Sequence, residues 1–162
     1  MALRLPQSQL DAMLRHGEST FPNECCGLLL GQAAATPEAP RVVAEAYPMR
    51  NANEASPANR FDFDPKEHLR AQREARERGL EIIGFYHSHP NHPARPSQYD
   101  LDHAAWPGYS YLIVSILDGH AAPGEAAARS FELAEDRSHF IQEAVEVVAE
   151  ARAPAPAGAP PR

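Results

Sequence analysis

The chain of 162 residues contains little of what secreted or membrane-spanning proteins depend on. It has two cysteines, and because Cys25 and Cys26 are adjacent they are poor disulfide partners for each other. A chain without a disulfide framework is typical of a reducing compartment, so we expect a cytoplasmic protein. The longest apolar runs are far shorter than the roughly 20 residues that a membrane span needs. No signal-peptide pattern opens the chain, so we expect no secretion.

Basic residues are also scarce. The chain has 15 Lys and Arg against 22 Asp and Glu, which leaves a net charge of −7 at pH 7. Nucleic-acid-binding domains carry a basic surplus, so we expect no nucleic-acid partner, and we expect no membrane partner either. The sequence gives no indication of an oligomeric state. A hydrophobic content of 43% is ordinary for a folded globular protein.

The spacing of apolar residues, with glycine and proline breaks between them, predicts one domain over residues 1–150. The expected helices cover residues 6–17, 64–78 and 97–105. The expected strands cover residues 25–30, 41–47, 60–63, 80–89, 109–117, 126–133 and 140–148. A helix stays open as the alternative for the last of these strands. Residues 151–162 are rich in alanine and proline and cannot bury an apolar face, so we expect disorder there.

Local signals support several of these elements. Gly17 is typical of a residue that ends a helix. Asp64 in the N-cap position, Pro65 in the first turn and Glu67 after it predict the start of a helix. The near-continuous apolar run of residues 25–30 predicts a strand that is buried on both faces.

The candidate site lies where the apolar run from Leu80 to Tyr86 leads into the segment His-Ser-His-Pro. Side chains alternate along a strand, so His87 and His89 project to one side and Ser88 to the other. A proline-rich turn follows.

After that turn, Ser97 occupies the N-cap position of an expected helix. Asp100, three residues later, lies on the same side of that helix, so both side chains can face the histidines.

Two imidazoles and one carboxylate provide three protein ligands and leave a fourth position for water, the arrangement of a catalytic zinc site. Imidazole nitrogens favour Zn²⁺ over Mg²⁺. The sequence therefore predicts one Zn²⁺, with His87, His89 and Asp100 as its ligands. His103, on the same face of the helix as Asp100, is the alternative third ligand.

Other metal chemistries fit the sequence less well. A structural zinc held by Cys25 and Cys26 with the two histidines is disfavoured, because adjacent strand residues point to opposite faces. The H-E-x-x-H motif of helical zinc peptidases is absent, as is the H-x-E and P-C-x-x-C pattern of zinc deaminases. His92 lies in the turn beside the site and can contact a substrate. The remaining histidines have no motif around them and are interpreted as surface residues: His16, His68, His120 and His139.

The arrangement His87-x-His89, seven intervening residues, then Ser97-x-x-Asp100 resembles the signature of the JAMM, or MPN-plus, metallopeptidases. That family also has a glutamate just before a glycine-containing strand, and Glu24 within residues 21–31 resembles that element closely. The resemblance spans Glu24 to Asp100 through motifs and residues 3–148 through the order of elements. It implies a single α/β domain with a curved, mixed β-sheet flanked by helices.

The resemblance also implies roles for two catalytic residues. Glu24 would be the general base that takes a proton from the attacking water and returns it to the leaving amine. The Ser97 hydroxyl would donate a hydrogen bond to the developing oxyanion. A competing role for Ser97 is the helix cap, and a hydroxyl bonded to its own helix is less free to serve a substrate.

The short form of this chain looks most like bacterial JAMM peptidases that act on ubiquitin-like sulfur-carrier proteins. The resemblance thus implies hydrolysis of an amide bond at the C-terminus of such a carrier or of its C-terminal adduct. We expect the extended tail to bind by adding a strand to a sheet edge. The loops at 48–59 and 118–125 are too short for the insertions with which longer relatives grip ubiquitin.

Two other functions stay open. The first is a general zinc peptidase that acts on short peptides. The second is a scaffold or interaction module without activity, like the metal-free MPN members of larger assemblies. All five chemical positions are filled, which favours an enzyme.

Overall fold

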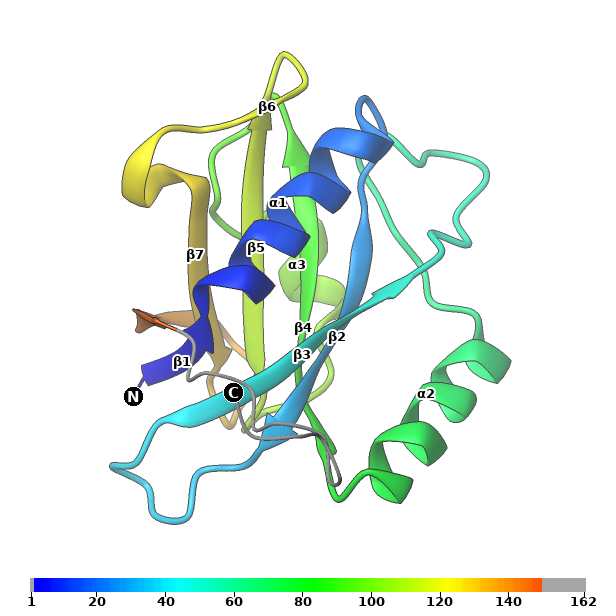
Figure 1. Cartoon of the computed structure of the whole chain (residues 1–162). Helices are drawn as coiled ribbons and strands as arrows, with labels where there is room; N and C mark the ends of the chain where they lie inside the picture. The colour runs from blue at the N-terminus through cyan, green and yellow to red at the C-terminus, as the bar shows by residue number, and fades with distance from the viewer. Residues whose placement is uncertain (1, 150–162) are drawn as a thin grey trace, which may run out of the picture.

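A computed structural model describes residues 2–149 (Figure 1). The elements follow one another as β1 (Ala2–Pro6), α1 (Gln7–Thr20), β2 (Cys26–Gln32), β3 (Arg41–Met49), α2 (Pro65–Glu77), β4 (Glu81–Pro90), α3 (Gln98–His103), β5 (Ser110–Leu117), β6 (His120–Ala121), the 3-10 helix η1 (Gly124–Ala127), β7 (Ala128–Leu133) and β8 (Phe140–Val148). No helix in this part of the chain is long and apolar enough to cross a membrane.

The strands form one strongly curved sheet in the order β4-β2-β3-β1-β8-β7-β5-β6. Strand β4 also pairs with β5, so the sheet curls until it closes on itself. The β4–β5, β1–β3 and β1–β8 pairs are parallel, whereas β2–β3, β2–β4, β5–β6, β5–β7 and β7–β8 are antiparallel. The expected α/β domain with a curved, mixed sheet is confirmed.

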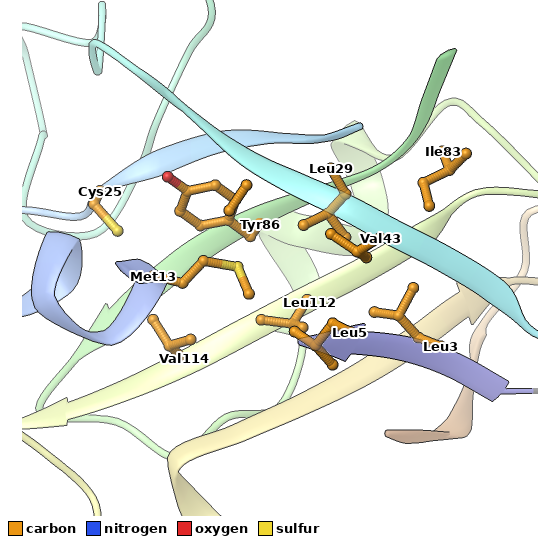
Figure 2. Close-up of a cluster of buried hydrophobic side chains, with 11 residues drawn as sticks. Leu3, Leu5, Met13, Cys25, Leu29, Val43, Ile83, Tyr86, Leu112 and Val114 are labelled. Carbon is orange, nitrogen blue, oxygen red and sulfur yellow. The ribbon is translucent and has the colours of Figure 1, made fainter. Parts of the chain in front are cut away.

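The main core fills the inside of the curved sheet. Figure 2 shows side chains of β1, β2, β4 and β5 directed at one another, with Met13 of α1 among them. Helix α1 packs against β3 and β5 and so covers this side. The outer side of β2 and β4 carries a second cluster that includes Leu28, Phe85 and Ala71 of α2. Because Leu29 belongs to the first cluster and Leu28 to the second, the expected burial of this strand on both faces is confirmed.

Gly17 is not a helix stop, and the expected helix 6–17 continues to Thr20. A Cβ at Gly17 would lie 2.9 Å from Ile116 Cγ1 and 3.2 Å from Ser88 Cβ. Glycine at this position therefore lets α1 approach β4 and β5 closely, a packing role that the local sequence does not distinguish from a stop.

The expected strand at 60–63 is wrong. The segment pairs with no strand, and the backbone of Asp62 bonds to the preceding loop instead. The Asp62 N–H donates to Asn51 Oδ1 at 3.2 Å, and the Asp62 carbonyl accepts from Ala52 N at 2.9 Å. The alternating apolar residues Phe61 and Phe63 were the signal, and their rings pack against the outer side of β4 instead.

Two short strands were not predicted. Strand β1 has five residues, and its main partner β8 lies about 140 positions away in the chain, so no local pattern marks it. Strand β6 has two residues and lies inside the expected turn at 118–125, where η1 also begins. Strand β8 is confirmed, and its helical alternative is wrong. The disorder expected for 151–162 concerns residues outside the described part of the chain.

Candidate active site

The pairing of β2 with β4 brings Glu24 to the histidines. The antiparallel register places Cys26 opposite His87, so Glu24, two residues earlier, falls opposite His89 on the same face. The Glu24 side chain is buried, and its backbone is fixed on both sides. Its amide donates to Pro57 O at 2.8 Å, and its carbonyl accepts from Asn51 Nδ2 at 3.2 Å. Glu24 and the two histidines are therefore close in space although they are far apart in the sequence.

The opposite face of the same strands holds Ser88. Its hydroxyl accepts a hydrogen bond from the Cys25 amide at 2.7 Å, and its own amide donates to Cys25 O at 3.1 Å. These bonds tie the end of β4 to the start of β2. The ring of Phe61 also stacks on His87, with centroids 4.7 Å apart. The two histidines are thus held on the expected common face by rigid neighbours.

Two ring nitrogens and one carboxylate converge at this face. His87 Nε2 and His89 Nε2 lie 3.0 Å apart. Asp100 Oδ1 lies 3.4 Å from His87 Nε2, and Asp100 Oδ2 lies 3.2 Å from His89 Nε2. His89 Nδ1 lies 3.0 Å from the carbonyl of Pro93, which can only accept, so Nδ1 carries the proton of a neutral ring and Nε2 presents a lone pair.

Helix α3 holds Asp100 in this position through a capping box, which confirms the expected cap. Ser97 Oγ accepts from Asp100 N at 3.0 Å, and Asp100 Oδ2 accepts from Ser97 N at 2.8 Å. The cap uses Ser97 Oγ as an acceptor, so the hydroxyl proton stays available as a donor. Capping and donation to a substrate are therefore compatible.

The environments of the two carboxylates push their pKa values in opposite directions. Burial raises the pKa of Glu24 to about 8, and within residues 2–149 its Oε1 has no hydrogen-bond partner. Burial acts to raise the pKa of Asp100 as well, but hydrogen bonds from His87, His89 and the Ser97 amide outweigh it and hold the pKa below its ordinary value. Two acidic groups with separated pKa values suit one fixed anion and one group that exchanges a proton.

The two imidazoles differ in the same way. Burial lowers the pKa of His87, and Asp100 offsets part of that effect. Burial acts to lower the pKa of His89 too, but the hydrogen bond and charge of Asp100 outweigh it and raise the pKa. A neutral imidazole is the form that binds a metal, which suits buried His87 in particular.

The rival ligands make other contacts. His103 Nδ1 bonds to the carbonyl of Tyr99 at 2.9 Å, and its ring stacks on Tyr99 with centroids 3.8 Å apart. Cys25 belongs to the inner core cluster and Cys26 to the outer one, so the two thiols face opposite ways. Glu24, by contrast, offers a carboxylate oxygen within 4.8 Å of ligand atoms of His87 and His89.

Two cavities flank the converging groups. The aromatic cavity, of about 300 Å³, adjoins His87 and Asp100. Its walls include Phe61, Phe63, Phe85, Tyr99, Trp106 and Tyr111. The Glu24 cavity, of about 340 Å³, adjoins His89 and Ser97. Its lining includes Glu24, Asn59, His89, His92, Arg95 and Ser97.

Sequence reasoning found His92 beside the site but missed Arg95 and the aromatic walls. The alternation of Phe61 and Phe63 was a usable signal that was assigned to a strand. His16, expected on the surface, is half-buried and bonds to Tyr86 Oη at 2.8 Å. His68, also expected on the surface, borders the aromatic cavity.

The fold is that of the JAB, or MPN, class. The chain belongs to the family described as prokaryotic homologs of the JAB domain, whose profile matches residues 6–134. This confirms the resemblance stated from the sequence.

Two relatives have names that describe an activity. A protein of Haloferax volcanii named desampylase is 36% identical over 117 residues, which cover 70% of this chain and 80% of that protein. A protein of Mycobacterium tuberculosis named CysO-cysteine peptidase is 33% identical over 111 residues, which cover 68% of this chain and 71% of that protein.

Solved structures agree on the fold. The solution structure of a Desulfitobacterium hafniense protein has a TM-score of 0.77 and 35% identity, and the match covers 93% of this chain and 94% of that one. A JAB1/MPN domain protein of Archaeoglobus fulgidus has a TM-score of 0.51 and 19% identity over 88% of this chain and 95% of that one, which shows a shared fold.

Proposed function

We propose that the chain is a zinc-dependent peptidase that hydrolyses an amide bond at the C-terminus of a ubiquitin-like sulfur-carrier protein. One observation carries the proposal. His89 Nε2 lies 3.0 Å from His87 Nε2 and 3.2 Å from a carboxylate oxygen of Asp100. Two imidazoles and a carboxylate this close need a positive charge among them, and a metal ion can supply that charge in place of a shared proton.

The donor set fits zinc. His87, His89 and Asp100 would hold the ion, because imidazole and carboxylate are its usual ligands and three of them suit a catalytic site. The His89–Pro93 hydrogen bond is the kind of support that orients a ligating imidazole. When bound, zinc lowers the pKa of a water and polarises the scissile carbonyl.

Glu24 is proposed as the general base rather than a fourth ligand. Within residues 2–149 it makes no hydrogen bond or ion pair with the two ring nitrogens, although a carboxylate oxygen lies within 4.8 Å of ligand atoms of both rings, whereas Asp100 lies within 3.4 Å of both. Its unpartnered Oε1 and its pKa of about 8 suit a group that accepts a proton from the attacking water and returns it to the leaving amine near neutral pH.

Ser97 is proposed to donate its free hydroxyl proton to the oxygen of the scissile carbonyl as negative charge develops there. The bond from Asp100 N to Ser97 Oγ holds the hydroxyl in place in advance. A donor that needs no reorganisation during the reaction stabilises the transition state more than a mobile one does.

We infer from the position of Glu24 which part of the substrate each cavity binds. A residue that protonates the leaving nitrogen must lie within hydrogen-bond reach of it, and Glu24 lines only one of the two. The leaving group therefore occupies the Glu24 cavity, and the acyl side, which is the tail of the carrier, runs through the aromatic cavity.

The tail does not pair with β4, as a sheet-edge mode would require, because β4 pairs with β2 and β5 at the site. The segment 61–63 borders the aromatic cavity instead. The backbone of Asp62 bonds to the preceding loop, whereas the backbone groups of Phe61 and Phe63 make no hydrogen bond within residues 2–149, and these groups are proposed to bind the tail.

The names of the relatives support this substrate class. One is named for cleaving a cysteine adduct of CysO, a ubiquitin-like sulfur carrier, and another is named a desampylase. Sulfur carriers work in the cytosol, which agrees with the cytoplasmic location expected from cysteine usage. Glycines at the end of such a tail let its backbone approach the site closely.

The test is intact mass spectrometry of a ubiquitin-like carrier that is extended by one amino acid beyond its C-terminal glycine. We expect zinc-loaded wild-type protein to release the added residue and Glu24→Gln to leave it in place. Efficient hydrolysis of unrelated short peptides, with the carrier left intact, would identify a general peptidase. Cleavage of neither substrate by zinc-loaded protein would support the scaffold alternative.

Metal content gives a separate prediction. We expect one zinc per chain, lost in Asp100→Asn and kept in His103→Ala. Asparagine retains an oxygen that can accept from the Ser97 amide but lacks the charge that the ion needs. Elemental analysis measures the zinc, and circular dichroism checks the fold. If His103→Ala loses the metal and Asp100→Asn keeps it, the ligand assignment is wrong.

A further inference from the structure

The Glu24 cavity contains a cation with no partner. Arg95 lines this cavity together with Glu24 and is exposed. Within residues 2–149 its guanidinium makes no hydrogen bond, ion pair or ring contact, although its backbone amide donates to Pro93 O at 2.8 Å. The backbone is therefore anchored beside the site while the charged group is unengaged.

The neighbouring cation is already engaged. The guanidinium of Arg60 lies 4.4 Å from the ring centre of Tyr99, a cation–π contact that joins the loop before α2 to α3. Arg60 does not line the Glu24 cavity. In a chain with a net charge of −7, Arg95 is the one lysine or arginine among the described residues that line this cavity, so it is a fixed positive charge that can attract an anion there.

From these observations we infer that Arg95 binds the α-carboxylate of the leaving group, so the preferred substrate is a carrier joined through its C-terminal glycine to the α-amino group of a free amino acid. This inference rests on the proposed function, which places the leaving group in the Glu24 cavity. It adds the chemistry of that leaving group, namely an amino acid with a free carboxylate.

The geometry of such an adduct suits the cavity. In an α-linked amino acid the carboxylate lies two bonds from the leaving nitrogen, so a nitrogen near Glu24 places the carboxylate within the same small cavity. A lysine isopeptide differs, because four methylene groups separate its leaving nitrogen from the α-carbon, and the carboxyl of that lysine is part of a protein backbone. Arginine pairs with carboxylates through parallel hydrogen bonds, which adds specificity.

The reaction balances as a hydrolysis. One water is consumed, its oxygen forms the new bond to the carbonyl carbon of the glycine, and the C–N bond to the amino acid breaks. The proton that Glu24 accepts from the water passes to the leaving nitrogen. The products are a carrier that ends in a glycine carboxylate and a free amino acid.

Three dye-labelled tail peptides test the inference. Each ends in Gly-Gly, joined to alanine with a free carboxylate, to alaninamide, or to the Nε of an amidated lysine. Wild type, Arg95→Gln and Arg95→Lys are compared by steady-state kinetics, with zinc loaded. Arg73→Gln is the matched control, because this substitution removes the same charge from a residue that is exposed on α2 and lines neither cavity.

We expect wild type and Arg73→Gln to have a KM for the alanine peptide about tenfold lower than for the other two, as for a partly exposed charge-assisted contact. Arg95→Gln should raise that KM to the alaninamide value and leave kcat and the alaninamide KM unchanged, and Arg95→Lys should lie between. Equal KM values for alanine and alaninamide in wild type, or a preference that survives in Arg95→Gln, would overturn the inference.

Failure of the proposed function would look different, since wild type would then cleave none of the three peptides. In that case fluorescence anisotropy with zinc-loaded Glu24→Gln protein measures peptide binding without turnover. Tighter binding of the alanine peptide that requires Arg95 would support the carboxylate site even so. Equal binding of the alanine and alaninamide peptides would reject it.

Discussion

Glu24→Gln is expected to lower kcat about 10²–10⁴-fold while zinc content and fold stay unchanged, since a general base typically contributes that much. Glutamine has the shape of glutamate but cannot take a proton from the attacking water. The affected group is buried, and its Oε1 has no partner within residues 2–149. The loss therefore reports on proton transfer and not on a broken contact.

The same substitution should leave the melting temperature equal or slightly higher. A buried group whose pKa is raised by desolvation destabilises the fold when it is charged, and a neutral isostere avoids that cost. Calorimetry, elemental analysis and kcat on one preparation separate the possibilities. Near-normal kcat in zinc-loaded Glu24→Gln would exclude Glu24 as the base, and a lost metal would make it a ligand.

The site could be predicted largely because its parts lie on elements with strong local signals. The apolar run predicts strand β4, which carries His87 and His89, and the N-cap predicts the start of helix α3, which carries Asp100. Glu24 is different, because 63 positions separate it from His87 and only the β2–β4 register joins them. From the chain alone, its proposed role rested on the family resemblance.

What the sequence could not provide depends on long-range packing. Strand β1 forms because β8 and β3 pair with it. Gly17 allows helix α1 to pack closely against Ile116, a residue nearly 100 positions later in the chain. The closure of the sheet between β4 and β5 also has no local signal. For Phe61 and Phe63 the local signal was present but its cause was different. The two side chains alternate because their rings pack on His87 and Phe85, and not because the segment is a strand.

The cavities were beyond sequence reasoning for the same reason. Each combines a loop before α2 with the segment around α3, and these are far apart in the chain. Arg95 lies between the histidines and Ser97 in the sequence, but its possible role depends on which residues of other segments line the same cavity. Its interest comes from facing the same cavity as Glu24.

Ser97→Ala is expected to lower kcat about 10²–10³-fold, the usual effect of removing one oxyanion donor. It should also lower the free energy of unfolding by about 1 kcal/mol, because the bond from Asp100 N to Ser97 Oγ caps α3. A loss of activity could therefore come from the donor or from a displaced Asp100, and two further substitutions separate these causes.

Glycine is nearly as good a cap as serine but has no hydroxyl, so Ser97→Gly should regain most of the lost stability and none of the lost kcat. Threonine provides both functions, so Ser97→Thr should keep most of each. Zinc content and urea unfolding are measured beside kcat for all three variants. If kcat follows stability and recovers in Ser97→Gly, Ser97 acts through the cap that positions Asp100, and the oxyanion must be stabilised by another group.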